Sequence, residues 1–217
     1  MVTMKKLGSR EEWLQARSKL IGGSDAACVL GLNPWKSNTE LWEEKTGKRV
    51  PTDIGDNEFV KYGHDAEPHI RALFALDFPQ YEVFYEEDNI WTNDKYPFAH
   101  ASLDGWIVEK ETGRKGILEI KTTNILQSMQ KEKWNERIPD NYFCQCMHYL
   151  MVTEFDFVIL KAQLKSEFNG ELYLQTKHYL MNREDFEEDI EYLKVAEQRF
   201  YENIVKNERP PFVLPQI

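Results

Sequence analysis

The residues of this chain best suited to chemistry are an aspartate and, further along, a glutamate and a lysine on a second segment. Asp104 lies in the apolar run 101–108, whereas Glu119 and Lys121 lie in the run 116–122. The polar stretch between the runs contains a Thr-Gly pair, which is typical of a turn. Two strand-like runs around a turn predict an antiparallel hairpin.

Such a hairpin brings the two carboxylates together. With the turn centred in the polar stretch, Asp104 lies opposite Glu119, and cross-strand Cβ atoms are about 4.5–5.5 Å apart. Alternate residues of a strand share a face, so Lys121 lies beside Glu119 while Leu118 and Ile120 face an apolar layer. Two carboxylates this close are unfavourable unless a proton or cation lies between them. Hard oxygen ligands of this kind suit Mg²⁺ or Mn²⁺.

The alternative is an exposed hairpin on which Asp104, Glu119 and Lys121 are simply solvated. The segments 101–103 and 116–118 are too apolar for a free ribbon. The sequence therefore favours a hairpin that lies inside a sheet.

An aspartate followed ten to twenty residues later by Glu-x-Lys resembles the core motif of the PD-(D/E)xK nucleases. Further elements extend the resemblance along most of the chain to the YqaJ-like and lambda-exonuclease-like phage recombination nucleases. In order, these elements are Arg17, Ile21-Gly22-Gly23-Ser24-Asp25-Ala26-Ala27, Gly31-Leu32-Asn33-Pro34-Trp35-Lys36-Ser37, Gly63-His64-Asp65-Ala66-Glu67, Ser102-Leu103-Asp104-Gly105, Leu118-Glu119-Ile120-Lys121 and Gln145. The motif alone is frequent by chance, but the ordered set is specific. One departure is Ser102, which stands where the family name has a proline and supplies no ligand.

The resemblance implies an α/β (α+β) fold with a restriction-endonuclease-like core, in which helices flank a central mixed sheet. It predicts a single nuclease domain over residues 1–217. Within it, we expect a helical N-terminal segment that binds DNA ends at 1–50, the PD-(D/E)xK core at 57–178 and a C-terminal helix at 183–206.

The resemblance also implies a metal site. Glu67, Asp104, Glu119 and the carbonyl oxygen of Ile120 are expected to bind Mg²⁺ or Mn²⁺, with two ions as the expected number. From the residues alone, Glu67 is equally compatible with a buried ion pair.

Catalytic roles are expected for Asp104, Glu119, Lys121 and Gln145. Lys121 orients or deprotonates the attacking water, and the sequence leaves open whether it is a base or a fixed positive charge. Gln145 lies in the run 138–153, which is apolar almost all round and predicts a buried helix. A buried amide needs partners, and a neighbouring backbone group is the simpler one. The resemblance implies instead that Gln145 helps to hold the water.

Arg17 and Ser24 are expected to form a pocket for a 5′-phosphate. Ser24 is expected to cap a helix that runs to about residue 30, and a helix N-terminus attracts anions. Arg17 offers a planar, permanently charged group to phosphate oxygens. The alternative is an ordinary N-cap, with Arg17 paired to Glu12 or Asp25.

The resemblance implies a Mg²⁺-dependent 5′-to-3′ exonuclease that digests duplex DNA from its ends and leaves 3′ single-stranded DNA. Alternatives are a restriction-like or structure-specific endonuclease of the same fold, and a non-catalytic DNA-binding or assembly protein. The resemblance further implies a homotrimeric ring, a single-strand annealing protein as partner, and a phage or prophage origin in a bacterial host.

Composition limits the other classes. No apolar run approaches the roughly twenty residues of a membrane span, so a soluble cytoplasmic protein is expected. The three cysteines have neither a disulfide framework nor a C-x-x-C motif, which indicates reduced, packed thiols. The net charge of −10 disfavours DNA binding. The acidity is concentrated in residues 51–100 and 151–217, however, away from most of the segments expected to contact phosphate.

The remaining periodicity predicts the elements that must position these side chains. Helices are expected at 10–20, 39–46 and 57–78, strands at 81–85, 90–92, 155–161 and 170–178, and a last helix at 183–206. The helix at 57–78 is expected to direct Glu67, Ile70, Leu73, Phe74 and Asp77 inward, with an interruption at Pro68. The opening fifty residues are expected to be helical, and the acidic face of the last helix is expected to be solvated.

Overall fold

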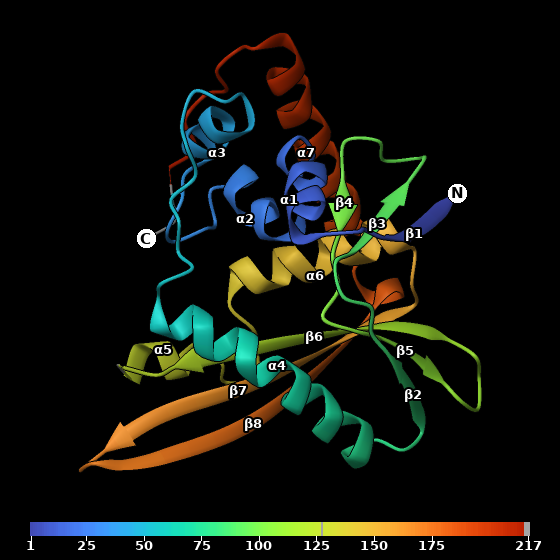
Figure 1. Cartoon of the computed structure of the whole chain (residues 1–217), viewed down its shortest axis with the longest axis vertical. Helices are drawn as coiled ribbons and strands as arrows, with labels where there is room; N and C mark the ends of the chain where they lie inside the picture. The colour runs from blue at the N-terminus through green and yellow to red at the C-terminus, as the bar shows by residue number, and fades with distance from the viewer. Residues whose placement is uncertain (127, 215–217) are drawn as a thin grey trace.

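The structure is a computed structural model that describes residues 1–126 and 128–214. Its strands form two sheets, which lie in different parts of the molecule (Figure 1). The larger sheet has the order β2-β5-β6-β7-β8 and the smaller one the order β1-β3-β4. The strands of the larger sheet are β2 Tyr81–Phe84, β5 Trp106–Glu109, β6 Lys115–Asn124, β7 Phe157–Phe168 and β8 Glu171–Asn182. Those of the smaller sheet are β1 Val2–Lys6, β3 Asn89–Asn93 and β4 His100–Ala101.

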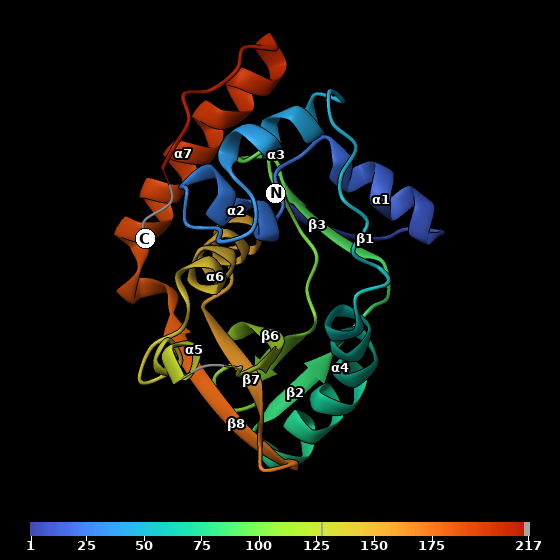
Figure 2. The same ribbon diagram turned by 90° about the vertical axis from the view of Figure 1, so that its left-hand side faces the viewer.

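Helices lie on both sides of the larger sheet. They are α1 Arg10–Ser18, α2 Gly23–Val29, α3 Asn38–Lys45, α4 Glu58–Asp77, α5 Ser128–Glu132, α6 Asp140–Thr153 and α7 Glu187–Lys206, with a 3₁₀ turn at Arg183–Asp185. Figure 2 shows α1, α2, α3 and α7 gathered above the sheet, with α6 between them and the strands. The predicted mixed sheet flanked by helices is confirmed.

Alternation along β6 decides which helix covers which face. Leu118 and Ile120 pack in one apolar cluster with Ile70 and Phe74 of α4. Ile117 points to the opposite face and belongs to the cluster that contains α6. The parallel strands β6 and β7 require a crossover connection, and the buried helix α6 provides it. The even-numbered apolar residues of β6 therefore face α4, as the sequence predicted.

The expected hairpin is confirmed, but its first strand begins later than predicted. Trp106 pairs with Ile117, and Leu118 N donates to the carbonyl of Gly105 at 3.0 Å. The prediction of a strand from Ala101 was wrong, because Ala101 pairs with Trp91 in the smaller sheet. The segment 102–105 carries the chain from one sheet to the other, and Asp104 lies on it.

The N-terminal segment is only partly helical. Three helices occur close to the predicted ranges, and the capping box of Ser37 and Glu40 begins α3 as expected. The expectation of a wholly helical segment was wrong, because β1 pairs with β3. The sequence cannot show this, since the partner strand lies more than eighty residues away. The N-cap of α2 is Gly22, and Ser24 lies in its first turn, so the predicted cap was also wrong.

Two long helices differ from their predictions in burial. In α4, Ile70 and Phe74 are buried but Leu73 is 52% exposed and Asp77 is also exposed, because the inward stripe is narrower than predicted. Pro68 lies inside α4 without ending it. In α7, the acidic side chains were expected to be solvated, yet Glu197 is 0% exposed, because α7 packs against α6.

Two observations bear on the expectations from composition. Cys28, Cys144 and Cys146 are free and buried. Within residues 1–126 and 128–214, no helix combines the length and apolar character needed to cross a membrane.

Candidate active site

A cleft of about 520 Å³ lies where α1, α4 and α6 meet the segment that precedes β5. Four of the predicted site residues line it, namely Arg17, Glu67, Asp104 and Gln145. Residues separated by more than a hundred positions are thus brought to one opening. Ser24, Glu119, Ile120 and Lys121 are not among its lining residues.

Asp104 and Glu119 form the buried acidic part of this site. The Oδ2 atom of Asp104 accepts a hydrogen bond from the backbone N–H of Ile120 at 2.9 Å, which ties it to β6 beside Glu119. Burial first, and then the Asp104 carboxylate, raise the pKa of Glu119 to about 8. Burial also raises the pKa of Asp104. Asp104 therefore destabilises the charge of Glu119, as expected of two carboxylates placed this close together.

Lys121 compensates part of this negative charge. Its Nζ lies 2.7 Å from Oε1 of Glu119. Burial opposes the charge of Lys121, but Glu119 and Asp104 together raise its pKa above the usual value. Among the residues that the structure describes, no group is aligned to donate a hydrogen bond to either carboxylate oxygen of Glu119. Lys121 and Glu119 therefore form a close ion pair inside the protein.

Glu67 approaches from α4 and is held by an arginine that the sequence interpretation missed. Arg71 Nη1 and Nη2 lie 3.1 Å from Oε1 of Glu67, and Nη1 also donates to the carbonyl of Asp104 at 2.7 Å. Burial first, then Asp104, raise the pKa of Glu67 to about 7. The spacing of Glu67 and Arg71, one helical turn apart, was the available signal. Both readings of Glu67 thus remain compatible with its position, because it makes an ion pair and also faces Asp104.

The carboxylates suit a hard divalent cation by chemistry and by their unmet acceptors. No group among the described residues is aligned to donate a hydrogen bond to the buried oxygens of Glu119, and Asp104 raises the pKa of both Glu67 and Glu119. Over the described part of the chain, no three His, Cys, Asp or Glu side chains are already gathered into a metal-binding group. Lys121 and Arg71 instead supply the positive charge to Glu119 and Glu67.

Gln145 lies on the opposite wall of the cleft. It is 8% exposed, and its Nε2 donates to the hydroxyl of Tyr149 at 2.8 Å. The simpler interpretation, a hydrogen bond from Gln145 to a neighbouring backbone group, was wrong, because the partner is the side chain of Tyr149. Tyr149 also lines the cleft, and burial together with Glu119 and Asp104 raises its pKa. The spacing of four residues on a buried helix could have identified Tyr149.

Arg17 has no acidic partner among the described residues. Glu12 instead accepts from the N–H of Gly8, and Asp25 pairs with Lys45 at 2.7 Å. The alternative pairings considered for Arg17 were therefore wrong. Its guanidinium lies 3.8 Å above the ring of Trp13, which holds it at the cleft without neutralising its charge.

Ser24 is exposed at the start of α2, next to the wall of the cleft. The preceding Gly23 lies so close to that wall that a Cβ there would be 2.4 Å from the ring of Tyr149 and 3.0 Å from Cγ of Gln145. Glycine thus lets α2 pack directly against the Gln145 side of the site. Ser24 therefore lies near the cleft, but of Ser24 and Arg17 only Arg17 lines it.

The sequence profile of the YqaJ-like viral recombinase domain matches residues 12–156, which is more than half of the chain. The YqaJ protein of Bacillus subtilis (strain 168) is 40% identical over 144 residues. That match covers 66% of this chain but 42% of the relative, so the chain spans about two fifths of the relative's length.

Two solved structures share the fold at low sequence identity. An alkaline exonuclease from Laribacter hongkongensis is 17% identical, with a TM-score of 0.60 over 91% of this chain and 95% of that one. A phage-related exonuclease from Haemophilus somnus 129PT is 12% identical, with a TM-score of 0.54 over 87% and 96% of the two chains.

Proposed function

This chain belongs to the YqaJ-like viral recombinase domain family, and we propose that it is a Mg²⁺-dependent 5′-to-3′ exonuclease of duplex DNA that leaves 3′ single-stranded DNA. The observation that carries the proposal is one cleft that joins Glu67 and Asp104, next to the buried Glu119–Lys121 pair, to Arg17, which has no acidic partner among the described residues. Carboxylates whose pKa is raised by a neighbouring carboxylate, together with such a guanidinium, suit the binding of a cation and of a phosphate at adjacent points.

The metal ligands in this proposal are Glu67, Asp104, Glu119 and the carbonyl of Ile120. They would hold Mg²⁺ or Mn²⁺, and we expect two ions. A bound ion of this kind lowers the pKa of a water molecule and stabilises negative charge on the phosphate. The buried, unmet oxygens of Glu119 support this assignment.

The other side chains have separate tasks. Lys121, held 2.7 Å from Glu119, orients the attacking water or accepts its proton. Gln145, fixed by its hydrogen bond to Tyr149, has its amide oxygen available to position that water. Arg17, with Ser24 beside it, would bind the terminal 5′-phosphate and place the next phosphodiester at the carboxylates. Cleavage then releases one nucleotide at a time. A structure of the Laribacter enzyme in complex with dAMP is consistent with a mononucleotide site in this fold.

The proposal extends to assembly and setting. We propose a homotrimeric ring that acts on double-stranded DNA with a single-strand annealing protein, in the cytoplasm of a bacterial host of a phage or prophage. Sedimentation of the purified chain tests the trimer directly.

The test of the reaction compares linear with covalently closed circular duplex DNA. With Mg²⁺, linear DNA should be degraded to mononucleotides, closed circles should persist, and a chelator should stop the reaction. Asp104→Ala, prepared in parallel, controls for contaminating nucleases. Cleavage of closed circles would show that the protein is an endonuclease instead. If linear DNA stays intact, the protein is a non-catalytic DNA-binding or assembly protein.

A further inference from the structure

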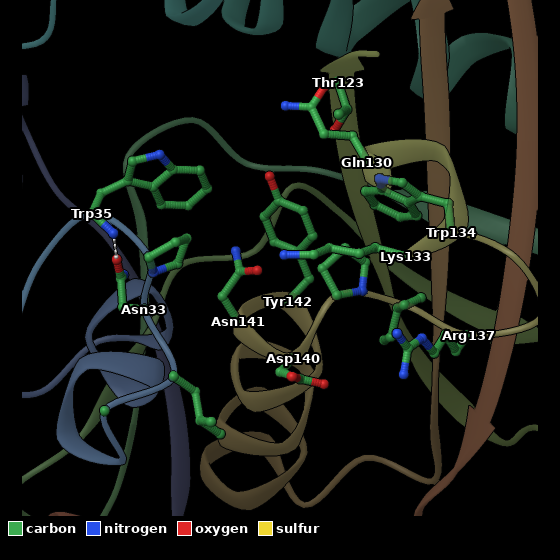
Figure 3. Close-up of a pocket in the computed structure, with 15 residues that line it drawn as sticks. Asn33, Trp35, Thr123, Gln130, Lys133, Trp134, Arg137, Asp140, Asn141 and Tyr142 are labelled. Carbon is green, nitrogen blue, oxygen red and sulfur yellow. Dashed lines mark hydrogen bonds between the residues drawn. The ribbon is translucent and has the colours of Figure 1, made fainter. Parts of the chain in front are cut away.

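A second opening of about 350 Å³ shares no lining residue with the cleft that contains Arg17. Figure 3 shows Trp35 and Trp134 on opposite sides of it, with Tyr142 between them. Trp35 belongs to the loop before α3, and Tyr142 belongs to the first turn of α6. None of these residues was assigned a role in the proposed reaction.

Trp35 is unusually accessible for its type, with 74% of its surface exposed. A large aromatic side chain held open to solvent loses the benefit of burial, so such rings are enriched at binding surfaces. Trp134, by contrast, is buried. The open indole is thus a flat surface at the mouth of a built pocket.

The pocket continues into a neighbouring groove along the end of β6. The groove shares Trp35, Thr123 and Tyr142 with the pocket and adds Phe59 and Tyr62 from the start of α4. Five aromatic side chains, with Trp134 of the pocket included, therefore border one continuous depression. Of the described residues that line the groove, none is acidic.

The charges of this surface are opposite to the charge of the whole chain. Lys133 and Arg137 line the pocket, and no carboxylate of the described residues pairs with either. Lys165 lies 3.4 Å above the ring of Tyr62 in the groove. Asp140 is the one carboxylate among the described residues lining the pocket and groove. A chain with net charge −10 thus presents an aromatic depression with three available cations.

The depression is continuous with the proposed reaction centre. The ring of Tyr142 lies 5.1 Å from Nζ of Lys121. Thr123 follows Lys121 by two positions on β6 and so shares its face of the strand. A strand of DNA whose phosphate lies at Lys121 would therefore reach Tyr142 and Trp35 within its next nucleotides.

We propose that this aromatic groove binds single-stranded DNA, with bases stacked on Trp35 and Tyr142 and phosphates bound by Lys133, Arg137 and Lys165. Aromatic rings on which bases stack, together with cations that bind the backbone, are the features by which proteins hold single strands independently of sequence. The inference rests on the proposed function, because it supplies the unpaired strand adjacent to the site of cleavage.

The test measures binding without cleavage. Fluorescence anisotropy of a labelled twelve-nucleotide oligo(dT) in chelator reports affinity of the full chain for a single strand. Trp35→Ala should weaken binding about tenfold, within the range for the loss of one stacked base, whereas Trp35→Phe should bind within about threefold of the parent. Lys133→Ala and Arg137→Ala should each flatten the dependence of log affinity on log salt by about 0.7.

Matched variants on α7 serve as controls. Tyr192 and Arg199 are exposed and line neither the pocket nor the groove, so Tyr192→Ala and Arg199→Ala should leave the affinity unchanged. If the parent fails to bind the oligonucleotide, or Trp35→Ala binds as tightly as the parent, the groove has another role. If the parent binds the oligonucleotide but cleaves no DNA, and Trp35→Ala loses that binding, the groove would be supported and the proposed reaction rejected.

Discussion

At the scale of single residues, the site depends on charges that are placed where water cannot screen them. Glu119 is fully buried and its pKa is raised to about 8, first by burial and then by Asp104. Lys121 is the cation that makes this arrangement tolerable, at 2.7 Å. Its position on the cleft side of β6 also makes it the group nearest to a reacting water in the proposed reaction.

Lys121→Ala should lower the rate of DNA cleavage by about 10²–10⁴-fold, the usual contribution of a group that moves or orients a proton. Binding of Mn²⁺, measured by calorimetry, should persist because the carboxylates remain. Lys19→Ala, on the exposed end of α1, is the control and should cleave normally. An unchanged cleavage rate in Lys121→Ala would mean that Lys121 only forms an ion pair with Glu119 and takes no part in the reaction.

Arg17→Ala should abolish the preference for 5′-phosphorylated over 5′-hydroxyl duplex ends. Arg17 is the cleft cation that lacks an acidic partner among the described residues, so its charge is available to a terminal phosphate. The measurement is the ratio of initial rates on the two kinds of end. Arg10→Ala is the control, because Arg10 lines the same cleft but lies 3.8 Å from Asp88. A ratio like that of the parent in Arg17→Ala would place the phosphate pocket elsewhere.

At the scale of elements, β6 joins the site to both layers of the core. Its face toward α6 carries Glu119 and Lys121, and its other face packs on α4 through Leu118 and Ile120. Gly116, at the start of this strand, lies against the ring of Phe157 on β7. A Cβ at Gly116 would come within 2.3 Å of that ring, so only glycine leaves room for the ring at this point.

Gly116→Ala should therefore destabilise the protein by about 1–3 kcal/mol, the usual cost of overpacking a core. Urea unfolding followed by circular dichroism measures the change. Phe157→Leu combined with Gly116→Ala should recover part of the loss, because the smaller side chain leaves room for the new methyl group. No recovery in the double variant would mean that the backbone of Gly116, and not the ring, is limiting.

At the scale of the whole molecule, a buried polar connection runs from α7 through α6 to the smaller sheet. His148 Nδ1 lies 2.7 Å from Glu197, and its Nε2 lies 2.8 Å from the carbonyl of His100. Both partners are acceptors, so both ring nitrogens donate and the imidazole is protonated. Burial lowers the pKa of His148, but Glu197 and the His100 carbonyl outweigh it and raise the pKa. Asp25 adds to the same effect.

A raised pKa in the folded state makes this contribution to stability depend on pH. It is fully present below the ordinary histidine pKa of about 6.5 and is lost as pH rises through the higher folded value. Glu197→Gln should therefore cost about 2 kcal/mol near pH 6, as for a hydrogen bond to a charged group, and less near pH 9. Urea unfolding at both pH values measures it. The ring of His100 does not add to this pH dependence, because burial holds its pKa well below the usual value. Equal losses at both pH values would show that His148 is neutral in the folded protein.

The sequence by itself determined the features that depend on local periodicity. Alternation placed Glu119 and Lys121 on one face of a strand and Leu118 and Ile120 on the other, since successive side chains of a strand point in opposite directions. The apolar run before residue 153 likewise indicated the buried helix that carries Gln145.

Only the tertiary structure decided which distant groups meet. Three features depend on segments far away in the chain. They are the pairing of β1 with β3, the hydrogen bond from Arg71 to the carbonyl of Asp104, and the burial of Glu197 against His148. Residues 102–105 were predicted as part of a strand because they lie within the run 101–108, but the competing pairing of Ala101 with Trp91 draws the chain to another sheet. Periodicity encodes which face of an element is apolar, whereas the partner of that face is selected by packing and hydrogen bonding across the whole fold.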